Sequence, residues 1–384
     1  MNGFDFLPEI IDLRKCFHRI PEIAGKEFKT CALIRETLSR IPGVEILEPF
    51  LGTDTVAVVR GGKGPGVNVL LRADIDALPG TENTGCEFAS IHPGMMHACG
   101  HDVHISVLIG AVRAIAECRN DFSGTVRFVF QPGEENKAMA RDLIAAGALG
   151  DPLPDVCAAL HVMPGKAAGE ISVRPGAMMA SCNVFNVIVH GQGGHGSLPC
   201  ASRSPLVAAA AMIMELQNIV ANRIDPRKAA VVSVCRFESG HTDNVIPDTA
   251  EFTGTLRSLD NETAGVLEDS LHEICNALAV VYRVKCDVQS NQSYLATCND
   301  PEVVERFCAV VKKLGIPLHI LPESAMSSED FSFYLDRIPG VFFHLGAGVD
   351  APSLHNSAFL PPDAVIENGI RVISAFALEC LKDR

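Results

Sequence analysis

The chain has 384 residues, of which 47% are hydrophobic and 20% are charged. This balance is typical of a globular protein, and the length exceeds what one hydrophobic core usually serves, so we expect two domains. The formal net charge is -14, and no run is rich in Lys and Arg. Because such a surface repels phosphate backbones, nucleic acid is excluded as an expected partner.

The N-terminal sequence carries acidic residues and lacks the basic start and apolar core of a signal peptide. Fourteen cysteines are scattered through the chain without a CxxC pair. We therefore expect a cytoplasmic protein in which most thiols are small, buried apolar groups rather than disulfides. The longest apolar stretch, residues 206–214, is too short to span a bilayer, so we expect no membrane partner.

The first half of the chain alternates between strand and helix patterns. Residues 5–40 have apolar positions at helical spacing, interrupted at Pro21. Further along, strands are predicted at 56–59, 67–71, 125–130 and 156–160, and helices at 104–118 and 136–146. This alternation predicts an α/β fold whose sheet has at least some parallel strands.

The pattern changes near Ser181. Beyond it, strands are predicted at 184–189, 230–237, 249–256 and 282–288, and helices at 205–220 and 262–280. This order predicts an open four-stranded sheet backed by two helices, the size of a small domain. Since the α/β pattern resumes after 299–301, we expect an inserted domain at 182–293 that interrupts a catalytic domain formed by 1–181 and 294–384.

Two clusters in the first half carry residues suited to metal chemistry. Asp74 and Asp76 follow a hydrophobic strand at a spacing that puts both on one face, although a polar strand end would look the same. The segment 96–104 holds three histidines, a cysteine and an acid, which packing alone hardly explains. Within it, Cys99 and His101 are the favoured ligands, because a thiolate and an imidazole two residues apart can reach a common metal pair.

A third cluster places Glu134 and Glu135 directly after a strand. Neighbouring side chains point in different directions, so one carboxylate can bind metal while the other acts as a general base. An acidic helix start is an equally good explanation of this pair taken alone. His161 and His355 are single histidines at predicted strand ends, and they gain weight only from the other clusters. His195 lies in a glycine-rich turn that by itself is a weak signal.

Taken in order, these segments resemble the M20 metallopeptidase family, and especially its amidohydrolase branch, which includes hippurate hydrolase, bacterial aminoacylases and plant auxin-conjugate hydrolases. The similarity runs from His18 to His355. Its most specific parts are 72–79, 96–104, 131–135, 244–248, 254–257 and 328–331. The sequence MHACGHD at 96–102 is similar to the branch in which a cysteine replaces a bridging carboxylate.

The resemblance implies a zinc-exopeptidase-like catalytic domain with a mixed sheet, and an inserted α+β domain that acts as a lid and forms a homodimer contact. It also implies two divalent ions per subunit, bound by Cys99, His101, Glu135, His161 and His355. By the same resemblance, Glu134 is the general base, Asp76 orients the metal site and His195 stabilises the oxyanion. Asn244 and Arg257 match positions near the carboxylate of the substrate.

The sequence departs from the family pattern in two places. After the glycine turn it has Cys200 and Ser204 in a region that usually holds a second histidine and an Asp-Pro pair, and residues 136–139 replace a glycine-rich run. Neither departure removes an expected ligand. Both fall where the substrate pocket or the lid contact would be, so the specificity of relatives transfers poorly.

We therefore expect hydrolysis of the amide bond of an N-acyl amino acid or small dipeptide. A thiolate ligand favours Zn, Mn, Co or Ni over Mg or Ca. Two alternatives remain open at this point: a catalytically inactive metal-binding paralogue that serves binding or assembly, and a redox protein that uses the Cys99 thiol. Retention of Glu134 argues against the first, because a binding protein needs no base.

Overall fold

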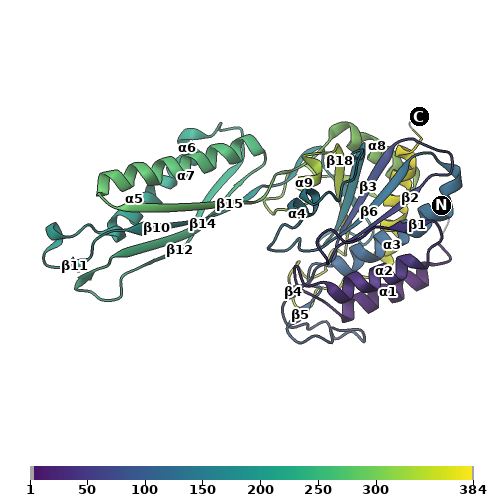
Figure 1. Cartoon of the computed structure of the whole chain (residues 1–384), viewed down its shortest axis with the longest axis horizontal. Helices are drawn as coiled ribbons and strands as arrows, with labels where there is room; N and C mark the ends of the chain where they lie inside the picture. The colour runs from purple at the N-terminus through teal and green to yellow at the C-terminus, as the bar shows by residue number, and fades with distance from the viewer. Residues whose placement is uncertain (1–3, 383–384) are drawn as a thin grey trace. The chain divides into compact units, whose positions relative to one another are not determined.

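The computed structural model describes residues 4–382 of the chain. Their contacts divide the chain into two compact units (Figure 1). The first comprises residues up to 176, 298–323 and 330 onward, and the second comprises 177–297 and 324–329. Each unit has a hydrophobic core of its own.

The first unit is built on a mixed eight-stranded sheet. Its strands, in spatial order, are β1 (Val44–Ile46), β2 (Thr55–Arg60), β6 (Thr125–Gln131), β3 (Asn68–Asp74), β7 (Val156–Met163), β18 (Gly340–Gly346), β8 (Ile171–Val173) and β17 (Leu318–Ile320). The four central strands β6, β3, β7 and β18 are parallel, while β2 and β8 join them in antiparallel orientation. The carboxyl ends of the four central strands therefore meet at one edge of the sheet, where α/β proteins place their sites.

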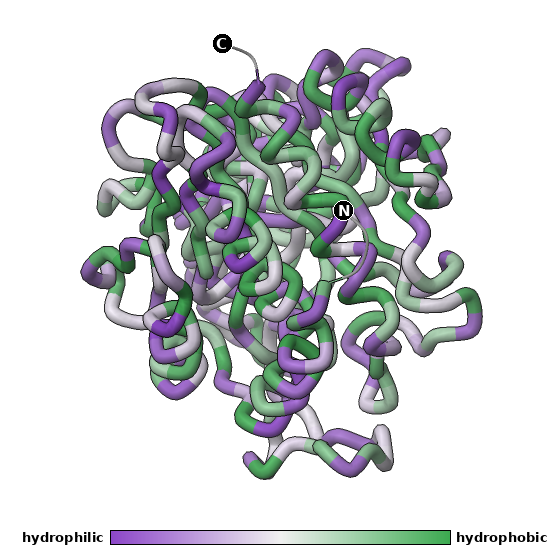
Figure 2. Tube along the Cα trace, turned by 90° about the vertical axis from the view of Figure 1, so that its right-hand side faces the viewer, coloured by the Kyte–Doolittle hydropathy of each residue, from purple (hydrophilic) through white to green (hydrophobic). Residues whose placement is uncertain are grey.

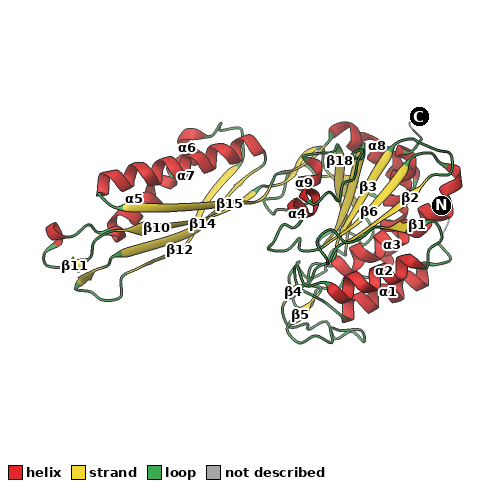
Figure 3. Ribbon diagram, viewed as in Figure 1, coloured by secondary structure: helices red, strands yellow, loops and turns green. Residues whose placement is uncertain are grey.

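Burial on both faces explains the composition of the central strands. Almost every residue of β3, β7 and β18 is buried, so these strands are continuous hydrophobic runs instead of alternating ones. Helices α3 and α10 contact this part of the sheet, and α1 packs against α3 (Figure 3). The trace coloured by hydropathy shows hydrophilic segments (purple) interspersed with hydrophobic ones (green) along the chain (Figure 2).

The α-helices of the first unit are α1 (Leu7–Arg19), α2 (Phe28–Ser39), α3 (His101–Glu117), α4 (Ala140–Ala145), α8 (Pro301–Lys313), α9 (Ser332–Leu335) and α10 (Ala364–Cys380), with a 3-10 turn at Arg119–Asp121. Among these helices, all within residues 4–382, only α8 begins at a capping side chain. The carboxylate of Asp300 accepts the backbone N–H groups of Glu302 and Val303, and Pro301 fits the first turn of α8. By contrast, α3 starts after Gly100, whose φ of 83° is left-handed, without a capping side chain.

The second unit has a four-stranded antiparallel sheet. Its strands, in spatial order, are β12 (Ala230–Ser239), β14 (Thr249–Ser258), β10 (Cys182–His190) and β15 (Lys285–Tyr294). Alternate residues of β10 and β14 are buried, because one face of the sheet packs against helices α5 (Pro205–Leu216) and α7 (Asn261–Tyr282). A short helix, α6 (Asn218–Arg223), follows α5, and a 3-10 turn lies at Pro199–Ala201.

The second unit also includes a short segment from much later in the chain. We expected a continuous insertion at 182–293, whereas the structure assigns 177–297 together with 324–329 to this unit. Backbone hydrogen bonds explain the addition, since Ala180 N donates to Ser327 O and Ala325 N donates to Met178 O. Such pairing between distant segments leaves no trace in local sequence patterns.

Short strand pairs complete the structure. They are β4 (Leu78–Pro79) with β5 (Met95–Met96), β11 (Gly194–His195) with β13 (Val245–Ile246), and β9 (Gly176–Met179) with β16 (Thr297–Asn299). Within residues 4–382, no helix has the length and apolar character needed to cross a membrane.

Candidate metal centre

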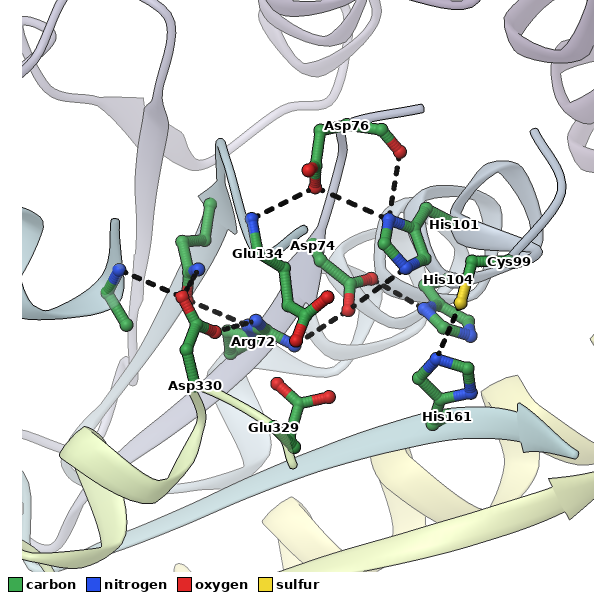
Figure 4. A network of polar contacts seen from close by, with 12 residues as sticks. Arg72, Asp74, Asp76, Cys99, His101, His104, Glu134, His161, Glu329 and Asp330 are labelled. Carbon is green, nitrogen blue, oxygen red and sulfur yellow. Dashed lines mark hydrogen bonds and ion pairs between the residues drawn. The ribbon is translucent and has the colours of Figure 1, made fainter. Parts of the chain in front are cut away.

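The five residues expected to bind metal lie together in the first unit, at the carboxyl edge of its sheet. Cys99 immediately precedes α3, and His101 is its first residue. Glu135 follows β6, His161 lies on β7, and His355 lies in the loop after β18. Several of these side chains are drawn in Figure 4.

The donor atoms are close enough to share metal ions. Cys99 Sγ lies 3.3 Å from His161 Nε2, and Glu135 Oε1 lies 3.1 Å from His355 Nε2. Ligand atoms of Cys99, His101 and His161 lie within 4.8 Å of one another, and so do those of Cys99, Glu135 and His355. Cys99 therefore belongs to both groups.

Hydrogen bonds orient two of the histidines toward this centre. His101 Nδ1 lies 2.8 Å from the carbonyl oxygen of Asp76, and His161 Nδ1 lies 2.6 Å from that of Val162. A carbonyl only accepts, so each Nδ1 carries a proton and, in the neutral ring, each Nε2 keeps a lone pair. The buried Nε2 of His101 has no hydrogen-bond partner among the described residues. Sulfur, imidazole and carboxylate donors held in this way fit transition-metal ions.

Electrostatics at the site also favour cations. Burial raises the pKa of Cys99 well above its ordinary value, and the carboxylates of Glu135 and Glu134 raise it further. Burial acts to lower the pKa of His101, yet Asp74 and Asp76 raise it to about 10. The cluster thus holds protons tightly on both groups in the absence of other cations. Divalent ions would replace those protons and stabilise the thiolate.

The carboxylate of Asp76 contacts the segments that carry Glu134, Glu135 and His101. Its Oδ1 accepts the backbone N–H of Glu134 at 3.1 Å, and its Oδ2 accepts that of Glu135 at 2.9 Å (Figure 4). Oδ1 also lies 3.4 Å from His101 Nδ1. One buried carboxylate therefore fixes the turn that carries both glutamates and the imidazole of His101.

A buried network beneath the centre was not predicted from the sequence. Arg72 Nη1 donates to Asp74 Oδ2 at 2.8 Å, and Nη2 donates to Asp330 Oδ1 at 2.5 Å. Asp74 Oδ1 lies 2.5 Å from His104 Nδ1, while His104 Nε2 accepts the N–H of Val162 at 2.9 Å. Burial raises the pKa of Asp74, but His101, His104 and Arg72 together hold it well below its usual range. The network thus ties β3 and β7 to α3.

Glu27 is another buried residue near the site that the sequence patterns did not single out. Its Oε1 accepts the backbone N–H groups of Gly25 at 2.8 Å and Gly133 at 2.9 Å, which anchors the turn before Glu134. Burial and the nearby charge of Asp76 raise the pKa of Glu27 to about 7. Its sequence neighbours Lys26 and Phe28 give no signal of this role, which depends on the distant contact with Gly133.

The remaining predicted residues belong to the second unit. His195 is exposed on β11, and Gly196 N donates to Asn244 O at 2.8 Å, so the strand pair holds the two residues together. His195 Nδ1 accepts the N–H of Ser197 at 3.1 Å, which leaves Nε2 as the protonated nitrogen of the neutral ring. Arg257 lies on β14, where Nη1 donates to Met326 O and Ser328 Oγ.

Comparisons with known proteins agree with this geometry. Residues 70–379 match the model of peptidase family M20/M25/M40. The chain is 36% identical over 369 residues to thermostable carboxypeptidase 1 of Saccharolobus solfataricus, covering 94% of this chain and 92% of that protein. It is 34% identical over 370 residues to N-acetyldiaminopimelate deacetylase of Listeria monocytogenes, covering 96% and 99%.

Solved structures give the same result. A putative aminohydrolase from methicillin-resistant Staphylococcus aureus superposes with a TM-score of 0.92 at 30% identity, covering 98% of this chain and 97% of the other. A Bacillus subtilis protein described as a dinuclear metal-binding peptidase of the M20 family superposes with a TM-score of 0.85 at 30% identity, covering 99% of each chain.

Proposed function

Because the chain belongs to peptidase family M20/M25/M40 and is a hydrolase of that family, we propose that it cleaves the amide bond of N-acyl amino acids or small dipeptides. One observation carries the proposal: buried sulfur, imidazole and carboxylate donors converge beside a further carboxylate, Glu134. Two relatives named carboxypeptidase and N-acetyldiaminopimelate deacetylase support an amide substrate.

We propose that Cys99, His101, Glu135, His161 and His355 would hold two divalent ions. A thiolate and three imidazoles favour Zn, Mn, Co or Ni. When bound, such ions supply a Lewis acid for the scissile carbonyl and lower the pKa of the attacking water. The protein residues then have to place the carbonyl, remove the proton from water and protonate the leaving nitrogen.

Glu134 is the proposed proton carrier. Its carboxylate lies in one group with His101 and Glu135, with ligand atoms within 4.8 Å, and it is largely buried. The hydrogen bond from its backbone N–H to Asp76 fixes where the side chain starts. In the proposed mechanism Glu134 takes a proton from water as the new C–O bond forms, then delivers it to the amine as the C–N bond breaks.

Residues of the second unit would complete the site. His195 would donate its Nε2–H to the oxyanion of the tetrahedral intermediate, consistent with a tautomer in which Nδ1 accepts from Ser197. Asn244 and Arg257 would bind the free carboxylate of the substrate. These roles require the second unit to act as a lid, and we propose that the same unit joins two chains in a homodimer in the cytoplasm.

The Cys99 environment disfavours the redox alternative. A reactive thiol needs a lowered pKa, whereas burial and two neighbouring carboxylates raise that of Cys99. An inactive paralogue would not need the buried base Glu134.

A substrate panel tests the proposal. Purified protein is stripped with a chelator, reloaded separately with Zn, Mn, Co or Ni, and assayed on N-acetyl amino acids, N-benzoyl amino acids and dipeptides. We expect hydrolysis of at least one substrate class that disappears on stripping and returns on reloading. Activity that survives complete stripping, or no turnover of any class by fully loaded protein, would overturn it. Cys99→Ala should lower metal occupancy in the same preparation.

A further inference from the structure

A separate group of metal-binding side chains lies beside the first helix. It consists of His18 at the end of α1 and of Glu82 and Cys86 in the loop between β4 and β5. Their ligand atoms lie within 4.8 Å of one another. His18 Nε2 is 3.1 Å from Glu82 Oε1, and Cys86 Sγ is 3.7 Å from the same oxygen. The proposed hydrolysis uses none of these three residues.

A buried carboxylate sets the orientation of His18. Its Nδ1 lies 2.9 Å from Asp102 Oδ2, and both residues are fully buried. Arg14 Nε donates to the same oxygen at 2.7 Å, so its charge is matched locally by Asp102. A carboxylate behind Nδ1 is the arrangement that directs a histidine Nε2 onto a metal ion. Here Nε2 faces Glu82 and Cys86.

Hydrogen bonds also position the side chains of Glu82 and Cys86. Glu82 Oε2 accepts the backbone N–H of Ser90 at 2.7 Å, while Oε1 accepts the hydroxyl of Thr84 and also faces His18 and Cys86. Thr84 Oγ1 lies 3.3 Å from Cys86 Sγ and helps to place it. Cys86 is only half-buried, so an ion could reach the group from solvent.

We propose that His18, Glu82 and Cys86 bind a third divalent ion, of the thiophilic class that includes Zn²⁺ and Cd²⁺. One nitrogen, one sulfur and one oxygen ligand with solvent in the fourth position suit such an ion. In the metal-free protein, His18 Nε2 and Glu82 Oε1 are at hydrogen-bond distance and share a proton. Binding replaces that proton and the Cys86 thiol proton, so two protons leave as one ion with two positive charges enters.

Metal counting tests this site. Chelator-stripped protein is titrated with Cd²⁺, and bound ions are counted by native mass spectrometry, with ¹¹³Cd NMR to detect thiolate-bound ions. We expect three ions per chain in the wild type, two in Cys86→Ala, and three in Cys86→His, which restores a ligand without sulfur. Cys308→Ala is the matched control, because this half-buried thiol lies on α8 away from the group, and it should keep three.

The outcomes separate this proposal from the hydrolase proposal. Cys86→Ala should keep amide hydrolysis at its two-ion loading, since the catalytic ligands are untouched. A wild type that stops at two ions, or a Cys86→Ala variant that still binds three, would overturn the third site whatever its activity. Absence of hydrolysis with three ions bound would instead count against the proposed function.

Discussion

Glu134 and Glu135 are neighbours in the chain, yet their surroundings suit them to different tasks. Separate oxygens of Asp76 hold their two backbone N–H groups. Glu135 lies 3.1 Å from His355 Nε2, and although burial raises its pKa, His355 and His101 bring it below the usual value. The lowered pKa keeps Glu135 ionised, as its proposed role as a metal ligand requires, and the proposed exchange of protons falls to Glu134.

Glu134→Gln should keep both metal ions and the fold while kcat falls by about three decades or more, because an amide cannot accept the proton from water. Steady-state kinetics and metal analysis of the same preparation measure this. Glu87→Gln, on an exposed position of the β4–β5 loop, is the control and should behave as the wild type. If the kcat of Glu134→Gln stays within about tenfold of the wild-type value, another group must be the base.

Glu27 predicts a pH dependence of stability. Its pKa is about 7 in the folded protein against 4.5 for a free group, so between these values the folded state keeps a proton that the unfolded state has lost. Stability must then fall as pH rises through this window. A glutamine at this position does not titrate, so Glu27→Gln has no such fall in stability. The free energy of unfolding of the variant relative to that of wild type should therefore increase from pH 5 to pH 8 by up to about 3 kcal/mol.

Denaturant unfolding of metal-free protein at the two pH values measures this difference. Glu36→Gln, on the exposed side of α2, should show no such trend. A Glu27→Gln stability difference that stays constant with pH would contradict the raised pKa.

At the scale of single elements, the sequence predicted the longer helices and strands up to residue 288 but displaced several boundaries, and it assigned no individual element after residue 301. The helix expected at 104–118 begins at His101, because a left-handed Gly100 starts it without a capping side chain to mark the position. The helix expected at 136–146 is reduced to Ala140–Ala145. Its first turn is missing because Asn136 and Ala138 have φ values of 65° and 48°, which no helix accommodates.

The expected helix at 205–220 is in fact two helices, α5 and α6, which meet at Gln217. The last strand of the second unit begins at Lys285 instead of 282, because α7 continues to Tyr282 and Arg283 ends it at a φ of 56°. A non-glycine residue in a left-handed conformation gives no sequence signal of a helix end.

Helix caps give an element-scale prediction in each unit. Asp300 caps α8 and Asp260 caps α7, where it accepts the N–H of Thr263 at 2.8 Å. Replacing either by Ala should lower the free energy of unfolding by about 1 kcal/mol, since the N–H groups of the first helical turn lose their acceptor. Hydrogen exchange should localise each effect to the unit that holds the helix. Asp336 is exposed and its side chain pairs with the adjacent Arg337, so Asp336→Ala should change stability by less than about 0.5 kcal/mol.

At the scale of the whole chain, the sequence pointed to segments that the structure brings together at one edge of the sheet, but it could not reveal their long-range connections. All the ligand candidates lie in motifs that were singled out beforehand. The contact between Arg72 and Asp330, however, joins residues 258 positions apart. The segment 324–329 likewise pairs with residues of the second unit that lie far from it in the chain. Such contacts depend on tertiary packing, which no local pattern of polarity or turn chemistry encodes.

A subunit-mixing experiment tests the proposed dimer and the role of His195. His195→Ala should lower kcat by about two to three decades, as for other lost oxyanion donors. If the histidine serves the neighbouring subunit, mixing inactive Glu134→Gln and His195→Ala chains should regain activity, because a mixed dimer combines one intact base with one intact histidine. Light scattering establishes the oligomeric state first. Dimers that exchange subunits without regaining activity would exclude the cross-subunit role, and a monomer would exclude the dimer as well.

The position of His355 has a consequence for how the protein is made. Four of the five proposed ligands lie between Cys99 and His161, whereas the fifth follows the whole of the second unit in the chain. During translation, a ribosome-bound chain therefore exposes a thiol and two imidazoles for the time taken to synthesise about two hundred further residues before the last ligand emerges. If these five residues hold the ions as proposed, the complete ligand set exists only after His355 has been synthesised and the second unit, which precedes it, can already have folded.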